Sequence, residues 1–442
     1  MKIFAVKNLD IKKVIPDYNK NYKEKYEWFI HTIIQQGIYH KDTDHHFVNL
    51  SSELLNKFIG ERKLKEVKQH LLKSGIIEEN PHYSAGNFSK SYRLAQKYHD
   101  SEMELIEIKG KKWKSYKKKV NYYQQLNLVH FNKQNFPYKL MYSNIGELLI
   151  DLPEASKTIN SIKENDPLLG TEKFQKHKYF MYDMYAQMIQ DRTYFFHPDK
   201  TTGRVYHNIA NLPRVLRQYI YHHSGQHLMQ VDIANSQPFL FIKLLKEYWL
   251  RKGKLPYFIS QSTSDISNIY PQFPLYPPYV LTISPSLPKD VQLYIDLAKK
   301  GVLYEHLMEK FGIEQTKENR DAFKKEFFHR IFYSKINPDW QHDYAKKFKI
   351  HFPNVYEAVQ WYKKDDYRQL PISLQTVESN LMISKACKRA IYELGDDVFI
   401  ITLHDSIICF EKDAPKMELI IREETERVFG YSPKVKVSAF NC

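Results

Sequence analysis

Apolar residues near the N-terminus recur at the spacing of amphipathic helices in three successive segments, residues 22–36, 51–60 and 61–75. Two short strand-like runs, IIEE and KSYRLA, follow on either side of a polar segment. Three helices and a hairpin form the element order of a winged helix-turn-helix. We therefore expect a winged-helix DNA-binding domain over residues 22–97.

The third of these helices carries the charge that a DNA-reading helix needs. Lys63 and Lys68 are predicted to lie mostly on its solvent face, where a recognition helix contacts DNA. Winged helices also serve as protein-contact or packing modules. Contact with DNA and contact with protein both stay open for this domain.

The next part of the chain is less regular. Residues 109–119 carry seven lysines around one Trp and one Tyr, which suits a segment that tracks a phosphate backbone and equally a solvated linker. We expect a basic linker over residues 98–120 and a mainly helical region over residues 121–198. Residues 254–290 are rich in Pro, Tyr and Ser and predict an extended insertion with little regular structure.

Two apolar strands in the C-terminal half each end at an aspartate. The run HLMQVD ends at Asp232 before an apolar helix, and a later strand ends at His404 and Asp405 before another apolar strand. Hard divalent cations bind anionic oxygen ligands on rigid elements, so both aspartates are candidate metal ligands. An aspartate after a strand also serves as a helix cap or a turn residue, and neither strand decides this alone.

The composition favours a nucleic-acid partner. The 442 residues contain 66 Lys and Arg against 51 Asp and Glu, a formal net charge of +15, and such an excess favours phosphate backbones through counterion release. Three cysteines are too few for a disulfide framework or a cysteine zinc site. No apolar run predicts a membrane span or a signal peptide, so we expect a cytoplasmic protein with no membrane partner.

Four separated segments, taken in their order, resemble the DNA polymerase I family (family A). They are the Thr-Gly-Arg segment, the strand that ends at Asp232 with the start of the helix after it, a basic helix, and a Gln-containing helix that leads into the His-Asp hairpin: 199–220, 227–245, 316–336 and 370–411. The resemblance implies an α+β right-hand polymerase with palm, fingers and thumb, preceded by the winged helix-turn-helix domain. The implied domains are a thumb-like region (121–198), a first palm part (199–245), fingers with the insertion (246–334) and a second palm part (335–442).

The resemblance also implies a two-metal site and a path for the primer-template. Asp232, the backbone carbonyl of Ile233 and Asp405 would hold two Mg2+ ions, and the two aspartates would be catalytic. The residues implied to contact primer or template in the polymerase are Arg204, Asn211, Arg217, Gln375 and His404.

The basic helix resembles the fingers helix of the family, in which an Arg, a Lys four residues later and a Tyr eight residues beyond that face the incoming nucleotide. Lys325 and Tyr333 have the eight-residue spacing but leave Arg320 one residue too far upstream. Lys324 fits Arg320 but loses the Tyr. We prefer Lys325 with Tyr333 and keep Lys324 as the alternative.

The residue five positions after Asp232 bears on the choice of sugar. DNA polymerases of the family carry a bulky Glu there and the RNA polymerases carry Gly, whereas this chain has Gln237. Gln is nearly isosteric with Glu and can hydrogen-bond Tyr333, which favours dNTPs over NTPs. Ser406, where the family has Glu, and the run Gly203–Tyr206 are instead similar to single-subunit, phage-type RNA polymerases.

The function implied is that of a template-directed DNA polymerase, a nucleotidyltransferase that adds dNTPs to a primer 3′-hydroxyl without a proofreading exonuclease. A compact enzyme with its own DNA-binding domain suits replication of a phage, plasmid or other mobile element. The partners expected are DNA primer-template and dNTPs, with a replication-initiation protein as a further one, and the chain is expected to be a monomer. The alternatives are a primer-independent RNA polymerase or primase, a non-catalytic replication initiator or regulator, and a degenerate polymerase that binds DNA without turnover.

Overall fold

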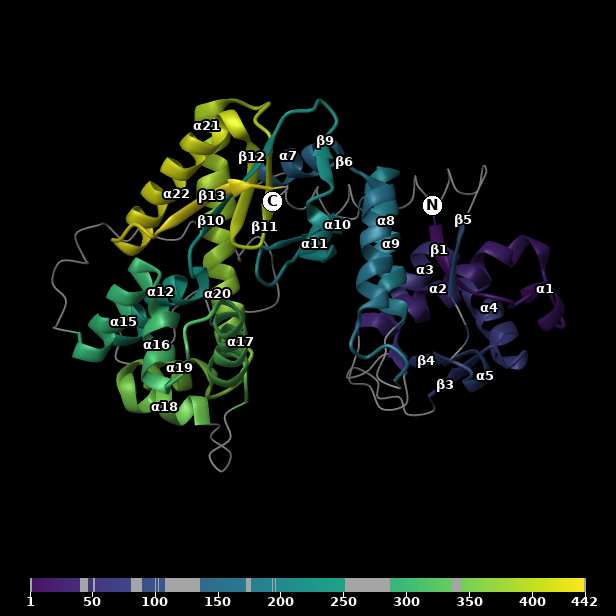
Figure 1. Ribbon diagram of the computed structural model, residues 1–442. Coiled ribbons are helices and arrows are strands. Elements are labelled where there is room, and N and C mark those ends of the chain that lie inside the picture. The colour runs from purple at the N-terminus through teal and green to yellow at the C-terminus, as the bar shows by residue number, and fades with distance from the viewer. Residues whose placement is uncertain are drawn as a thin grey trace. The chain divides into compact units, whose positions relative to one another are not determined.

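The computed structural model divides the chain into two compact units, coloured along the sequence in Figure 1. Unit 1 consists of residues 1–127, 146–195 and 207–223, and unit 2 of residues 128–145, 196–206 and 224–442. The structure describes residues 2–39, 47–50, 52–80, 90–99, 101, 103–107, 136–171, 176–192, 194, 196–250, 287–335 and 343–440.

The N-terminal part of unit 1 contains the helices and the hairpin that the hydrophobic pattern predicts. They are α2 (Lys23–Tyr39), α3 (Ser52–Ile59), α4 (Glu61–Lys73), β3 (Ile77–Glu79) and β4 (Ser91–Leu94). A further short strand, β2 (Val48–Asn49), pairs with β4 and gives a sheet of order β2-β4-β3. Tyr26 and Phe29 of α2 are fully buried, as the apolar stripe requires.

A second strand pair in unit 1 was not predicted. β1 (Lys2–Val6) pairs antiparallel with β5 (Met103–Glu107), so the predicted basic linker contains a strand. Its lysine-rich run, residues 109–119, lies outside the described residues. The short helices of unit 1 are α1 (Ile11–Val14), the 3-10 turn η1 (Lys20–Tyr22), α5 (Gln96–His99), α10 (Asn208–Asn211) and α11 (Arg214–Arg217).

Residues 121–198, predicted as one helical thumb-like region, contribute to both units. α7 (Phe136–Ile145) belongs to unit 2, and β6 (Leu148–Ile150), α8 (Leu152–Glu164) and α9 (Lys176–Gln190) belong to unit 1. Helix α9 packs on α8, α2 and β1. The predicted helical region is interrupted by β6, which pairs antiparallel with β9 (Ile220–His222). A thumb role for this region stays a prediction.

Unit 2 is organised around a four-stranded antiparallel sheet of order β11-β12-β10-β13. Its strands are β10 (Leu228–Ile233), β11 (Ile400–Leu403), β12 (Ser406–Phe410) and β13 (Val435–Ala439). Every residue of β11 and β12 is buried, which explains why their sequences read as near-continuous apolar runs. Helices α7 and α22 (Ala414–Phe429) pack on this sheet.

The remaining elements of unit 2 lie beside the sheet or, for the helices coloured green, below it in Figure 1. They are β7 (Phe196–Pro198) and β8 (Val205–His207), α12 (Ser236–Leu250), α15 (Lys289–Lys300), α16 (Leu303–Phe311), α17 (Lys317–Phe327) with the π turn η4 (Phe328–Phe332), α18 (Asp343–His351), α19 (Pro353–Lys363), α20 (Gln369–Ser379) with the π turn η6 (Asn380–Cys387), α21 (Lys388–Leu394) and the 3-10 turn η7 (Glu411–Asp413). Residues 251–286, most of the predicted insertion, lie outside the described residues. Among the described residues, none of the helices combines the length and the apolar character needed to cross a membrane.

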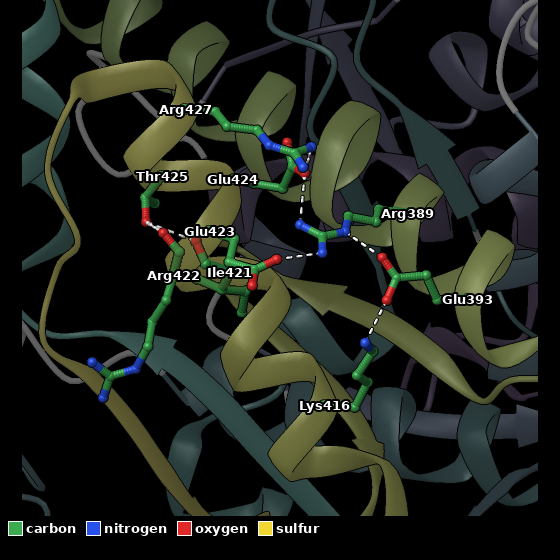
Figure 2. A network of polar contacts seen from close by, with 9 residues as sticks. All are labelled: Arg389, Glu393, Lys416, Ile421, Arg422, Glu423, Glu424, Thr425 and Arg427. Atoms are coloured by element: carbon green, nitrogen blue, oxygen red, sulfur yellow. Dashed lines mark hydrogen bonds and ion pairs between the residues drawn. The ribbon is translucent and has the colours of Figure 1, made fainter.

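Helices α21 and α22 are joined by a network of charged side chains around Arg389 (Figure 2). Its guanidinium contacts Glu393 on its own helix and both Glu423 and Glu424 on α22, the last at 3.1 Å. Lys416 of α22 contacts Glu393 in turn at 2.5 Å. The contacts of Arg389 therefore tie α21 to α22, one of the helices that pack on the sheet.

We expect Arg389→Ala to lower the free energy of unfolding by about 1 kcal/mol, because partly buried charge-assisted contacts are lost together. Arg422→Ala is the matched control, since Arg422 pairs only within α22, with Glu418. Its expected effect is no more than about 0.5 kcal/mol. Urea unfolding of both variants checks the prediction, and equal effects would assign no special role to the network.

Candidate active site

The turn between β11 and β12 brings Asp405 to the end of β10. Leu403 pairs with Ser406, so His404 and Asp405 form a two-residue hairpin turn. His404 has φ +55, the left-handed conformation that such tight turns use and that few non-glycine residues adopt. Asp232 lies directly opposite Ser406 in the β10–β12 ladder. One predicted carboxylate therefore lies on β10 and the other on the turn directly before the adjacent strand β12.

The pKa of Asp232 is affected by the second carboxylate. Burial, followed by the charge of Asp405, raises the pKa of Asp232 to about 7, while Lys324 and Lys436 lower it. Its Oδ1 atom is buried and has no hydrogen-bond partner among the described residues. Ionised Asp232 is thus disfavoured unless a cation compensates its charge.

Asp405 has one side-chain contact that the sequence analysis missed. The hydroxyl of Ser236, the first residue of α12, donates a hydrogen bond to Asp405 Oδ2. Ser236 is itself buried. This bond fixes the carboxylate on its turn and leaves the other oxygen available to a ligand.

The donor set fits a magnesium site. Asp232 and Asp405 offer carboxylate oxygens, which hard cations prefer, and the partnerless buried oxygen of Asp232 lacks the compensating charge that such an ion would supply. Ile233 is the last residue of β10, opposite Val435. Its carbonyl as a further ligand stays a prediction.

The fingers-like helix begins at Thr316, whose side chain accepts a hydrogen bond from the Asn319 N–H at 3.1 Å. Regular α-helix ends at Phe327, and the chain continues as a π turn. The Tyr333 N–H donates to the Phe328 carbonyl, five residues back, at 2.9 Å. A π turn adds one residue to the helical repeat, and this matches the one-residue excess between Arg320 and the tyrosine.

The π turn bears on the register of this helix. Lys325 was preferred for its eight-residue spacing from Tyr333, and Lys324 was kept as the alternative because it fits Arg320. With the extra residue of the π turn, Lys324 keeps its four-residue spacing from Arg320 and the turn still ends at the tyrosine. Lys324 also lowers the pKa of Asp232. Which of the two lysines contacts a nucleotide stays a prediction.

Tyr333 contacts the residue predicted to choose the sugar. Its hydroxyl donates to Gln237 Oε1, the contact expected from the sequence. Burial raises the pKa of Tyr333 to about 12, so the hydroxyl stays protonated and able to donate. Side chains from α12 and from the end of the π turn meet at this point.

Arg320 is held by two neighbours. It donates from Nε to Glu305 Oε1 on α16 at 2.6 Å and from Nη2 to Asn235 Oδ1 at 3.1 Å. Asn235, in the left-handed conformation with φ +52, also donates to the Gly301 carbonyl at 2.6 Å. Asn235, in the loop after Asp232, is therefore tied to Arg320 of α17 and to Gly301 at the C-terminal end of α15.

Arg204, predicted from the Thr-Gly-Arg segment, forms a buried ion pair with Glu378 of α20 at 2.5 Å. Burial raises the pKa of Glu378 to about 7, Arg204 lowers it, and Asp405 raises it further. Tyr138 of α7 donates to the Gly203 carbonyl at 2.8 Å. The sequence analysis missed Glu378, although one acidic residue on the apolar face of this helix was a usable signal.

The other predicted primer-template residues of unit 2 lie on the elements expected. Gln375 is half-buried in α20, and His404 is exposed at the hairpin turn. Their contacts with a primer stay predictions.

The remaining predicted site residues belong to unit 1. Arg217 donates to the carbonyls of Leu212 at 3.0 Å and Ala210 at 3.3 Å, and burial lowers its pKa. Asn211 donates to the Tyr185 hydroxyl at 3.4 Å. The side chains of Arg217 and Asn211, which were predicted to contact the primer-template, thus form hydrogen bonds within unit 1.

On α4, the two predicted DNA-contacting lysines differ. Lys63 is exposed, whereas Lys68 lies 3.6 Å from Glu79 and over the ring of Tyr92. Lys63 is therefore more available than Lys68 for contact with a phosphate group of DNA.

The comparisons with known proteins add little to this geometry. No family model matches the chain. No curated protein matches it either. Among solved structures, it is similar to the POL domain of Pol1 from M. smegmatis in complex with DNA primer-template and dNTP, at 13% identity and a TM-score of 0.30, over 69% of this chain and 70% of that one. A TM-score this low assigns no role to any residue of this chain.

One other cluster in the described part of the chain has metal-ligand character. Glu147, His222 and His223 of unit 1 place their ligand atoms within 4.8 Å of one another, and His223 Nε2 lies 2.5 Å from Glu147 Oε2. Backbone pairing between β6 and β9 holds them together. The sequence analysis did not single out this group.

Proposed function

We propose that this protein is a DNA-directed DNA polymerase that adds dNTPs to a primer 3′-hydroxyl by a two-metal mechanism. The observation that carries the proposal is the pair Asp232, on β10, and Asp405, on the turn before the adjacent strand β12. Burial and the charge of Asp405 raise the pKa of Asp232 to about 7, and its buried Oδ1 has no hydrogen-bond partner among the described residues. A carboxylate whose ionisation is opposed in this way is suited to binding divalent cations.

Two bound Mg2+ ions would lower the pKa of the primer hydroxyl and stabilise charge on the leaving pyrophosphate. The chain's own residues position the reactants. Lys324 and Arg320 are the cations available to the triphosphate, and Ser236 keeps the Asp405 carboxylate oriented. Transfer then needs little covalent help from the protein, because positioning and charge stabilisation supply most of the rate.

The contact between Gln237 and Tyr333 supports a preference for dNTPs. A ribose 2′-hydroxyl placed beside these two half-buried side chains would have to displace the amide from the tyrosine hydroxyl, and this would break their hydrogen bond. The polymerase would therefore select against ribose by shape and by the loss of this bond.

Lys324→Ala is expected to raise the KM for dNTP about tenfold, because one charge-assisted contact with the triphosphate is lost. Lys325→Ala, the neighbouring change on the same exposed turn, should leave KM within about twofold. Steady-state extension at varied dNTP concentration checks both. A larger rise in KM for Lys325→Ala than for Lys324→Ala would contradict this prediction and assign the nucleotide contact to Lys325.

The N-terminal elements support a DNA-contact role. Helices α2, α3 and α4 with the sheet β2-β4-β3 have the order of a winged helix, and Lys63 of α4 is exposed for phosphate contact. A DNA-binding module in the same chain suits recruitment to the replication origin of a phage, plasmid or other mobile element.

A primer-independent RNA polymerase or primase is the second candidate, and Ser406 favours it. The side chain is fully buried, accepts from Gln230 at 3.0 Å and donates to the Leu403 carbonyl at 2.8 Å. No third carboxylate therefore adjoins the hairpin at the position where the DNA polymerases of the family have Glu.

The test is a single-nucleotide extension assay on four templates that differ only in the first unpaired base. With Mg2+ and a labelled DNA primer, each template should accept only its complementary dNTP. Extension by NTPs, or products without a primer, would favour the RNA polymerase. Retained DNA binding with no product from any nucleotide would support an initiator or regulator.

A further inference from the structure

Three side chains of unit 1 that can ligate a metal ion, those of Glu147, His222 and His223, lie close together. Their ligand atoms, one from each residue, are all within 4.8 Å of one another. His223 Nε2 lies 2.5 Å from Glu147 Oε2, and the centroids of the two imidazole rings are 4.7 Å apart. Ligand atoms around one tetrahedral zinc ion are about 3.4 Å apart, so small side-chain rotations would let one ion contact all three residues.

Backbone pairing fixes the positions from which these side chains project. Leu148 of β6 lies opposite His222 of β9. The His223 N–H donates to the Glu147 carbonyl at 3.1 Å, which extends the strand pair by one residue. Leu148 is fully buried. The three side chains therefore come from a paired and anchored backbone, and an ion that binds there has little backbone to order.

The three side chains differ in exposure in a way that suits an ion site. His222 is buried, with 7% of its surface exposed, so its imidazole is confined by its surroundings. The side chains of Glu147 and His223 are each 43% exposed. This exposed side gives an ion a path into the group and leaves room for a water molecule as a further ligand.

The ligand set distinguishes between classes of metal ion. Two imidazoles and one carboxylate are a protein ligand set typical of zinc sites that keep a position for water. Mg2+ and Ca2+ prefer oxygen ligands throughout. This group is therefore chemically unlike the pair Asp232 and Asp405, which offers carboxylate oxygens, and Zn2+ is the ion that it fits.

We propose that Glu147, His222 and His223 form a zinc site that ties β6 to β9. His223 is the last residue of one segment of unit 1, and Glu147 is the second residue of another. An ion ligated from both sides would hold the ends of these two segments together. The inference goes beyond the proposed function and does not depend on it, because none of the three residues takes part in nucleotide addition.

The test is a zinc titration of the full-length protein, without a histidine tag, in competition with a chromophoric chelator and in excess Mg2+. Magnesium competes for sites made of oxygen ligands and leaves the histidine group available. The wild type is expected to bind one Zn2+ ion. His223→Ala should weaken this binding at least about tenfold, because a ligand is lost. Glu147→Gln should weaken it in the same direction.

Two variants serve as controls for the position of the ion. His227→Ala removes an exposed histidine four residues after His223 and should leave zinc affinity unchanged. Asp405→Ala should also bind zinc like the wild type. Hydrogen exchange reports on the strand pair itself. Zinc should slow the exchange of the β6 and β9 amides in the wild type and not in His223→Ala.

The inference is overturned if the wild type binds no zinc, or if His223→Ala and Glu147→Gln both bind it like the wild type. Loss of zinc binding in Asp405→Ala would place the ion at the aspartate pair and overturn it as well. Zinc that binds without slowing exchange in β6 and β9 would contradict the role in strand pairing. Should His223→Ala fail to fold, as judged by thermal unfolding, Glu147→Gln decides.

Discussion

Asp232→Asn is expected to lower the single-turnover rate of nucleotide addition about a thousandfold, since a metal ligand contributes several kcal/mol to the transition state. The neutral amide keeps the shape of the side chain but cannot compensate a divalent cation. Binding of primer-template should persist, because the charge removed is negative. Rapid-quench extension of a labelled primer and a parallel DNA-binding titration measure the two effects.

The stability of this variant gives an independent readout. Asp232 is buried beside Asp405, and its ionised form is disfavoured in the metal-free protein. Asp232→Asn should therefore unfold at no lower temperature than the wild type. Asp296→Asn, on the exposed surface of α15 beside Lys299, is the control and should keep full activity. A rate for Asp232→Asn within tenfold of the wild type would contradict the metal-ligand role.

Gln237→Ala is expected to lower the discrimination of dNTPs over NTPs by about ten- to a hundredfold, mainly by raising kcat/KM for NTPs. Removal of the amide opens the space beside Tyr333 and deletes the hydrogen bond that holds the tyrosine hydroxyl. Competition between dATP and ATP on one template position gives the ratio directly.

Two variants separate the steric cause from the hydrogen bond. Tyr333→Phe removes only the hydroxyl, so its effect on sugar discrimination should be smaller than that of Gln237→Ala. Gln292→Ala makes the same substitution at an exposed position of α15 and should leave the ratio unchanged. An unaltered ratio in Gln237→Ala would remove the proposed basis of dNTP preference.

The parts of the site that the sequence predicts are those encoded by local pattern. The buried strands of unit 2 are apolar runs of strand length, and a polar His-Asp pair between two of them requires a hairpin turn. Asp232 and Asp405 could be predicted as one site because each lies at the end of such a strand. The contact of Gln237 with Tyr333 was predicted for a different reason, namely the resemblance.

The parts that the sequence did not predict depend on contacts between distant segments or on irregular backbone. Strand β1 pairs with β5 across some hundred residues, and no local pattern encodes that partner. The π turn before Tyr333 adds one residue between Arg320 and the tyrosine, and a regular α-helix has no place for that extra residue. Ser236 contacts Asp405 only because the start of α12 lies beside the hairpin turn in the folded chain.

The central claim is that Asp232 and Asp405 catalyse metal-dependent copying of DNA, and one assay tests it most directly. Wild-type protein and Asp405→Ala are given a labelled primer on a DNA template with dNTPs, in Mg2+ and in EDTA. The account predicts templated extension only by the wild type in Mg2+. Extension by Asp405→Ala at the wild-type rate, or none by a wild type that still binds the DNA, would contradict it.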